Sequence, residues 1–158
     1  MLADPSGSGE PMVRKKNWGI YGVVEQQIYR PKGGDAESGI SLFGRVSYSP
    51  SDRNPINFFA DGGIIFAGMV PGRPDDKFGA SILYARVSDS VRAFDRDPAA
   101  FSAVPGVIHD YEMNLEFTYS AQIVPGWTVQ PVLTYVWHPG GGDWPDALVV
   151  GGRSIWRF

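Results

Sequence analysis

Glu112 and Glu116 are the two residues of this sequence whose type and spacing come nearest to a catalytic pair. Two carboxylates can serve a glycosidase as acid and as base or nucleophile when they lie about 5 to 9.5 Å apart. Both glutamates fall in a segment that alternates polar and apolar residues, and residues four apart on one strand are separated by about 13 Å. We therefore expect no catalytic residue and no enzyme activity.

The sequence also lacks the residue patterns of a metal or cofactor site. The chain has no cysteine, which excludes thiolate zinc sites and iron-sulfur clusters, and its two histidines, His109 and His138, flank different loops. The glycines at 140–142 follow a predicted strand and open no helix, so they do not form a phosphate loop. The formal net charge of −3 argues against a nucleic-acid partner. We expect neither a metal nor a cofactor.

The elements that carry these residues are predicted to be strands. From Asp110 to Ile123 every odd-numbered residue is apolar and every even-numbered residue is polar. This period of two places the two sets on opposite faces of a strand, whereas a helix would bury carboxylates. The same alternation predicts six further strands, at residues 18–30, 40–49, 56–70, 77–88, 127–138 and 146–158. Residues 1–17 are predicted to be a polar tail, and residues 89–109, with Pro98 and Pro105, a long loop.

Strand length and aromatic placement separate the possible all-β architectures. Strands of soluble proteins average about 5 to 6 residues, whereas those predicted here run to about 10 to 14, which suits a tilted strand that crosses a bilayer. Large aromatics lie near strand ends, as in the interfacial girdles of a transmembrane β-barrel. The predicted girdle residues are Tyr111, Trp127, Trp137, Trp156 and Phe158. Two alternatives stay open: a soluble β-barrel or sandwich that binds a ligand, and a structural outer-membrane barrel that conducts nothing.

Several segments together carry a family resemblance. They are WGIYGVVEQQIYR (18–30), SPSDRNPINFFADGG (49–63), VPGRPDDKFGASILYARVSDSVRAFD (70–95), YEMNLEFTYSAQIVPGWTVQPVLTYVWHPGGG (111–142) and the final ALVVGGRSIWRF. In this order they resemble the C-terminal portion of the carbohydrate-selective porins of the OprB type. The resemblance implies part of a sixteen-stranded antiparallel barrel in a Gram-negative outer membrane, through which carbohydrates diffuse passively. A terminal Phe158 resembles the signal read by the barrel assembly machinery.

Seven predicted strands are fewer than half of such a barrel. A seven-stranded sheet has two open edges, and unpaired backbone groups are not tolerated against lipid. We therefore expect the chain to be a C-terminal fragment whose partners are the missing N-terminal strands and outer-membrane lipid. The first residues lack the apolar core of a signal peptide, so we expect no export signal in this chain.

If the apolar faces contact lipid, the opposite faces line a wet lumen. Carboxylates accept hydrogen bonds from sugar hydroxyls while Arg and Asn donate to them, so a mixed polar wall can replace part of a sugar's hydration. The predicted lumen residues are Glu25, Gln27, Arg45, Asp61, Glu112, Asn114, Glu116, Gln130, Arg153 and Arg157, with Asp110 and His138 at the loop side.

Overall fold

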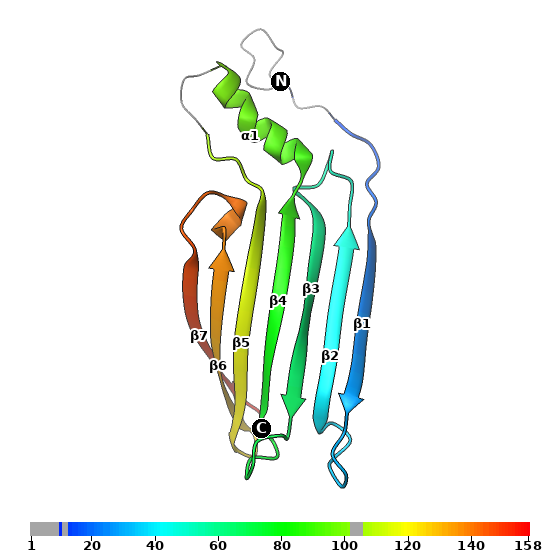
Figure 1. Cartoon of the computed structure of the whole chain (residues 1–158), viewed down its shortest axis with the longest axis vertical. Coiled ribbons are helices and arrows are strands. Elements are labelled where there is room, and N and C mark those ends of the chain that lie inside the picture. Colours follow the sequence, from blue (N-terminus) through cyan, green and yellow to red (C-terminus); the bar gives the residue numbers. More distant parts are fainter. Residues whose placement is uncertain (1–9, 11–12, 102–105) are drawn as a thin grey trace.

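Seven antiparallel strands in chain order make up the sheet (Figure 1). The structure is a computed structural model and describes residues 10, 13–101 and 106–158. The strands are β1 (Ile20–Tyr29), β2 (Gly39–Tyr48), β3 (Ile56–Ala67), β4 (Lys77–Val87), β5 (Tyr111–Val124), β6 (Trp127–Trp137) and β7 (Ala147–Trp156). All seven predicted strands are confirmed, and β5, the clearest case of alternation, is also the longest, with 14 residues.

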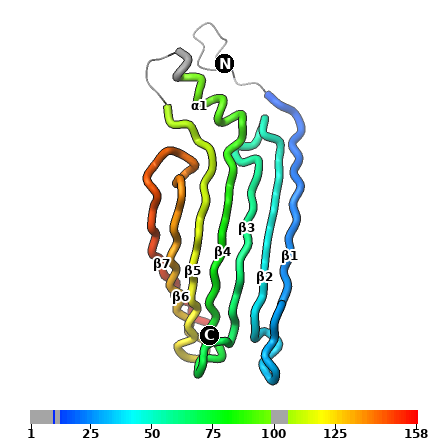
Figure 2. Tube along the Cα trace, viewed as in Figure 1, coloured from blue at the N-terminus to red at the C-terminus, as the bar shows by residue number. Residues whose placement is uncertain are grey.

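The strands lie side by side in a single layer, and each connection joins neighbours (Figure 2). We call the end that holds residues 49–55, 88–101, 106–110 and 138–146 the loop end, and the opposite end, with residues 30–38, 68–76 and 125–126, the turn end. The C-terminus lies at the turn end (Figure 1). In the described part of the chain β1 and β7 are both edge strands and are not paired with each other.

Few apolar side chains are fully buried within this sheet. Among the described hydrophobic residues only Ala67 and Val87 are buried, while Phe117 is 51% and Val150 77% exposed. A large exposed apolar surface marks contact with a partner or a membrane. The soluble barrel or sandwich predicted as an alternative requires these side chains to be enclosed, and the described chain does not enclose them.

The prediction that residues 89–109 form a loop was wrong for its first part. Residues Asp89–Phe101 form a helix, α1, beyond the loop end (Figure 1). Ser88 begins it: its Oγ accepts a hydrogen bond from the N–H of Val91 at 3.4 Å, and its carbonyl accepts one from Arg92 at 3.1 Å. Such a capping serine satisfies N–H groups that the first helical turn leaves free. Pro98 indicated a loop, yet it lies inside the helix. No helix in the described residues is long and apolar enough to cross a membrane.

Gly63 in β3 allows a close approach between strands. It pairs with Phe43 of β2, and a Cβ at Gly63 would lie 2.7 Å from Phe43 Cε1 and 2.5 Å from the Ala80 carbonyl oxygen. We expect Gly63→Ala to lower the free energy of unfolding by about 1–3 kcal/mol, because the added methyl overpacks this contact. Urea unfolding followed by tryptophan fluorescence in detergent measures it.

Gly151 of β7 provides the matched control. A Cβ there meets nothing within 4 Å, so Gly151→Ala should leave the unfolding midpoint nearly unchanged. Equal shifts in the two variants would show that the close approach at Gly63 does not limit stability.

Candidate functional site

One face of the sheet carries the predicted lumen residues. We call it the polar face and define it by Glu116, which lies opposite Ser81 of β4 and Thr134 of β6. Because paired residues share a face and alternate residues along a strand share a face, the register extends this assignment from β1 to β7. The ten residues Glu25, Gln27, Arg45, Asp61, Glu112, Asn114, Glu116, Gln130, Arg153 and, by continuation beyond β7, Arg157 all lie on it.

Arg45 and Asp61 form the most complete ion pair on the polar face. They are directly paired across β2 and β3, and Asp61 accepts hydrogen bonds from Arg45 Nε at 2.9 Å and Nη2 at 2.7 Å. The Asp61 side chain is only 8% exposed, while that of Arg45 is 57% exposed. The guanidinium therefore presents its remaining N–H donors to solvent beside a neutralised carboxylate.

A second row of polar contacts crosses β5, β6 and β7. Gln130 Nε2 donates to Thr118 Oγ1 at 2.8 Å, and Gln130 Oε1 accepts from Arg153 Nη2 at 2.5 Å. One step along the strands, Thr134 Oγ1 donates to Glu116 Oε2 at 3.4 Å. The row presents donors and acceptors side by side, which suits weak exchange of hydrogen bonds with a hydroxylated solute.

Of the other predicted lumen residues, some have side chains that form hydrogen bonds with neighbouring residues and some do not. Glu112 accepts from Asn114 Nδ2 at 3.2 Å and from the N–H of Gly140 at 2.6 Å, so it anchors the short helix η1 (Pro139–Gly141). Gln27 donates to the Ser38 carbonyl at 2.9 Å. Glu25 and Arg157 make no side-chain hydrogen bond or ion pair with the part of the chain that is described.

His138 does not join the polar face, contrary to the alternation. Its backbone adopts the left-handed conformation with φ 48°, and its ring contacts that of Tyr111 with centroids 4.5 Å apart. Tyr111 belongs to the opposite face. A change of backbone region at the end of a strand breaks the period of two, and the sequence pattern carries no sign of it.

The polar face is hollowed at the turn end. A cavity of about 670 Å³ lies between strand residues and the adjoining turns. Lys77, Arg153 and Arg157 line it from the strand side, while Asp35 and Glu37 line it from residues 30–38. Lys77 Nζ lies 3.3 Å from Glu37 Oε2. Both signs of charge therefore face the same hollow, so it does not select strongly for either sign.

The apolar face bears aromatic residues in two rows. At the turn end Phe66 stacks on Phe78 with centroids 4.6 Å apart, and Trp127 stacks on Trp156 at 4.7 Å. The neighbouring rings at the loop end are Trp18–Tyr48, Phe58–Tyr84, Tyr84–Tyr111 and Tyr135–Trp137. Between the rows the face carries mostly small or aliphatic residues, together with Phe117 of β5 and the polar Gln26 of β1, which pairs with Leu42.

Four of the five predicted girdle residues belong to these rows: Trp127 and Trp156 at one end, Tyr111 and Trp137 at the other. Phe158 follows β7 and is fully exposed. The prediction missed Tyr48, Phe58, Phe66, Phe78 and Tyr84, whose places become clear only once the register aligns the strand ends. An aromatic at each end of most predicted strands was the signal that could have found them.

Comparison with known proteins identifies the family. The model of the OprB family of carbohydrate-selective porins matches residues 2–158. The chain belongs to this porin family. Porins are channels and not enzymes, so the prediction of no enzyme activity is confirmed.

Two relatives show how far the similarity extends. Porin B of Pseudomonas aeruginosa is 30% identical over 143 residues, which are 84% of this chain and 31% of that protein. A solved high-pH structure of Pseudomonas putida OprB superposes with a TM-score of 0.80 and 27% identity, covering 88% of this chain and 34% of that one. The chain thus spans about a third of the length of these OprB-family relatives.

In this porin-family sheet a buried carboxylate fixes the turn end. Asp76, whose side chain is 1% exposed, accepts hydrogen bonds from Arg73 Nε at 2.6 Å, from Tyr119 Oη at 2.5 Å and from the N–H of Gln122 at 2.9 Å. The Arg73 guanidinium, with help from these other donors, lowers the pKa of Asp76 to about 2. The turn at 68–76 is thereby attached to β5, next to the hollow.

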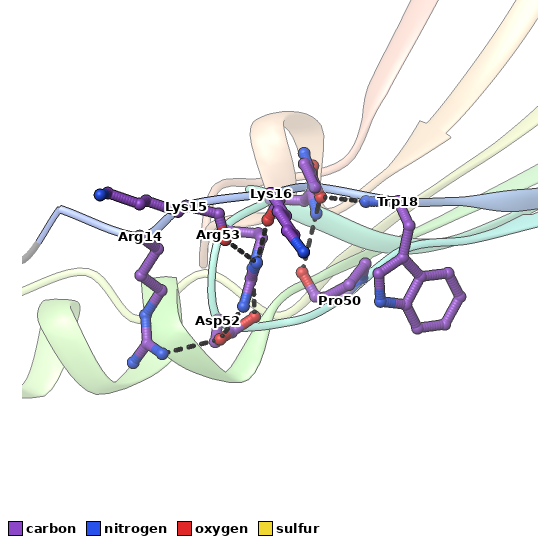
Figure 3. A network of polar contacts seen from close by, with 9 residues as sticks. Arg14, Lys15, Lys16, Trp18, Pro50, Asp52 and Arg53 are labelled. Atoms are coloured by element: carbon purple, nitrogen blue, oxygen red, sulfur yellow. Dashed lines mark hydrogen bonds and ion pairs between the residues drawn. The ribbon is translucent and has the colours of Figure 1, made fainter.

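At the loop end a polar network holds the residues that lead into β1 (Figure 3). Arg53 Nη1 donates to the carbonyls of Lys15, at 3.1 Å, and of Lys16, and Arg14 pairs with Asp52 at 2.9 Å. Residues 1–9 and 11–12 of the predicted tail lie outside the described residues. Its part from Arg14 onward contacts the loop between β2 and β3, which positions the start of the porin's first described strand.

Proposed function

We propose that this sheet forms part of the wall of an outer-membrane barrel through which carbohydrates diffuse passively. Its polar face lines a water-filled channel, and its apolar face contacts lipid. The observation that supports this most strongly is the division of the sheet: cross-strand polar contacts occupy one face, and an exposed apolar band between two aromatic rows occupies the other. Transmembrane barrels have this division, with aromatic girdles at both interfaces.

The proposed channel wall suits neutral, hydroxylated solutes. Arg45 is neutralised by Asp61, whereas Arg153 donates to the uncharged amide of Gln130 and keeps its charge. Carboxylates such as Glu25 and Glu116 lie on the same face, so neither sign of charge dominates the wall. Each hydroxyl that leaves water finds a partner of modest strength, so a sugar is neither excluded nor retained.

Closure requires strands beyond those described. β1 and β7 run in the same direction, because six antiparallel steps separate them in the order β1 to β7. An antiparallel barrel that contains this sheet therefore needs an odd number of additional strands between β7 and β1. One extra strand would give an eight-stranded barrel filled by side chains, so a channel requires several more. We propose that residues 18–158 are the C-terminal part of a sixteen-stranded barrel and that residues 1–17 are a polar segment before it.

A chimera tests this proposal. Residues 18–158 would replace the matching part of Pseudomonas aeruginosa Porin B, and the purified barrel would be reconstituted into liposomes. We expect swelling in isotonic glucose and maltose that slows as the saccharide becomes longer, because passage is limited by the width of the channel. The parent Porin B is the positive control.

A folded chimera that sits in the bilayer without swelling would support the other outer-membrane alternative, a barrel that conducts nothing. Swelling that is insensitive to sugar size would contradict passage through a defined channel. Heat-dependent mobility on gels reports whether the barrel has folded before either result is interpreted.

A further inference from the structure

A second hollow lies at the loop end, away from the polar contacts described above. It has a volume of about 450 Å³ and is bounded by residues 106–108, which lead into β5, and by the segment after β6. Its polar lining includes Asp110, His138 and Asp143, and its apolar lining includes Val107 and Ile108. A concave site with an apolar wall and a few polar groups is the usual form of a small-molecule site.

Trp144 lies beside this hollow, next to its lining residues Gly142 and Asp143. Its side chain is 60% exposed, a value close to those of Trp18 and Trp156. The indole lies over Gly142: a Cβ at Gly142 would be 2.9 Å from Trp144 Cδ1, 3.0 Å from Nε1 and 3.0 Å from Val107 Cγ1. The ring therefore packs against bare backbone, and a glycine is needed beneath it.

Hydrogen bonds within the loop hold the backbone that lines the hollow. Gly140 and Gly141 adopt positive φ angles of 69° and 78°, which glycine tolerates without strain. Gly141 donates to the His138 carbonyl at 2.7 Å and accepts from the N–H of Asp110 at 2.7 Å. The backbone that lines the hollow is thus held in place before any ligand arrives, which lowers the entropy lost on binding.

The charges around the hollow restrict the ligand. Asp143 is exposed and forms no ion pair among the described residues, while Asp110 is 3.3 Å from Arg92 Nη1. The free Asp143 carboxylate disfavours phosphates and other anions and accepts hydrogen bonds from hydroxyls, and Asp110, although paired with Arg92, has further lone pairs to accept them. The lining therefore suits a ligand that carries hydroxyls, has no negative charge and offers an apolar side to Val107 and Ile108.

We propose that Trp144 and this hollow form a saccharide-binding site at the loop end. The C–H face of a pyranose ring packs on the exposed indole, since the electron-rich face of an aromatic attracts positively polarised hydrogens. Hydroxyls on the ring edge donate to Asp143 and Asp110. This inference rests on the proposed carbohydrate permeation and adds a site that holds a sugar at the loop end before it passes along the polar face.

Nitrogen-15 labelling of tryptophan gives a direct test, because the chain has five tryptophans and hence five indole N–H signals. The full chain in detergent micelles would be titrated with methyl β-D-glucoside. We expect the Trp144 signal to shift and saturate while those of Trp127 and Trp156, in the turn-end row, stay fixed. Glycerol phosphate, an anion with hydroxyls, should produce a much smaller shift.

Two variants connect the signal to the site. Gly142→Ala should displace the indole and raise the dissociation constant for the sugar about tenfold. Trp144→Ala should raise it by a similar factor, measured by saturation transfer to the sugar because the indole signal is lost. Trp144→Phe should retain part of the affinity, since it keeps an aromatic ring. The other indole signals report whether each variant keeps its fold. An unsaturable shift, equal shifts at all tryptophans, or unchanged affinity in Trp144→Ala would overturn the proposal.

The chimera separates this inference from the proposed function. Sugar flux through the chimera combined with no binding at Trp144 would overturn the site and leave permeation standing. Saturable binding at Trp144 in a folded chimera that passes no sugar would overturn permeation and leave the site standing.

Discussion

Phe117→Arg is expected to lower the free energy of unfolding of the assembled barrel by about 2–4 kcal/mol, the range for a cation placed on the lipid face near the bilayer midplane. Phe117 lies near the middle of β5, between Ala80 and Leu133 on the apolar face, and is 51% exposed. In the proposed barrel an arginine there would face hydrocarbon without a partner. The experiment is urea unfolding of the Porin B chimera in lipid vesicles, followed by tryptophan fluorescence.

Glu116→Arg is the control, one residue away on the opposite face. Its cross-strand neighbours are Ser81 and Thr134, and its carboxylate accepts a hydrogen bond of 3.4 Å from Thr134 Oγ1. We expect this change to leave unfolding nearly unaltered and to shift the ion selectivity of the channel toward anions, because a negative wall charge becomes positive. Equal destabilisation by the two substitutions would contradict the assignment of the faces.

Asp76→Ala is expected to lower the free energy of unfolding by about 1–3 kcal/mol, because it leaves covered hydrogen-bond donors without a partner. The N–H of Gln122 and the hydroxyl of Tyr119 both point at this carboxylate, and Arg73 loses its 2.6 Å contact. Asp75 supplies a matched control, since it is the exposed neighbour in the same turn. Asp75→Ala should leave the urea midpoint unchanged. If it lowered the free energy of unfolding as much as Asp76→Ala does, the effect would belong to the turn in general and not to the Asp76 hydrogen bonds.

The same carboxylate predicts a pH dependence. The pKa of Asp76 is lowered from 3.8 to about 2 in the folded protein, so its ionised form is favoured by folding. Its contribution to stability is complete above pH 4 or so and is lost as the pH falls through about 2. Unfolding of the wild type should therefore become easier across this acid range, and Asp76→Ala should remove that part of the dependence. Wild type and variant with parallel acid profiles would contradict the assignment.

The sequence alone determined the strands and the composition of their two faces. The alternation of β5 depends only on the local geometry of an extended chain, in which neighbouring side chains point to opposite sides, so no long-range contact is needed to detect it. The family resemblance followed from the same segments, and the family is confirmed. The position of Trp127 and Trp137 at opposite strand ends could be predicted because both belong to a single strand.

What the tertiary structure decided depends on residues far apart in the chain. Arg45 meets Asp61, and Tyr119 meets Asp76, only because of the register between strands, which no single-strand pattern specifies. The helix α1 and the left-handed turn at His138 also escaped prediction, since the first contains Pro98 and the second is a change of backbone conformation at a single residue. The position of Trp144 over Gly142 is also local and depends on the backbone angles of the loop, which the alternation of polar and apolar residues does not specify. The contacts of Arg45 with Asp61 and of Tyr119 with Asp76 arise from strand pairing and loop closure, so their free energy appears only when the sheet has formed.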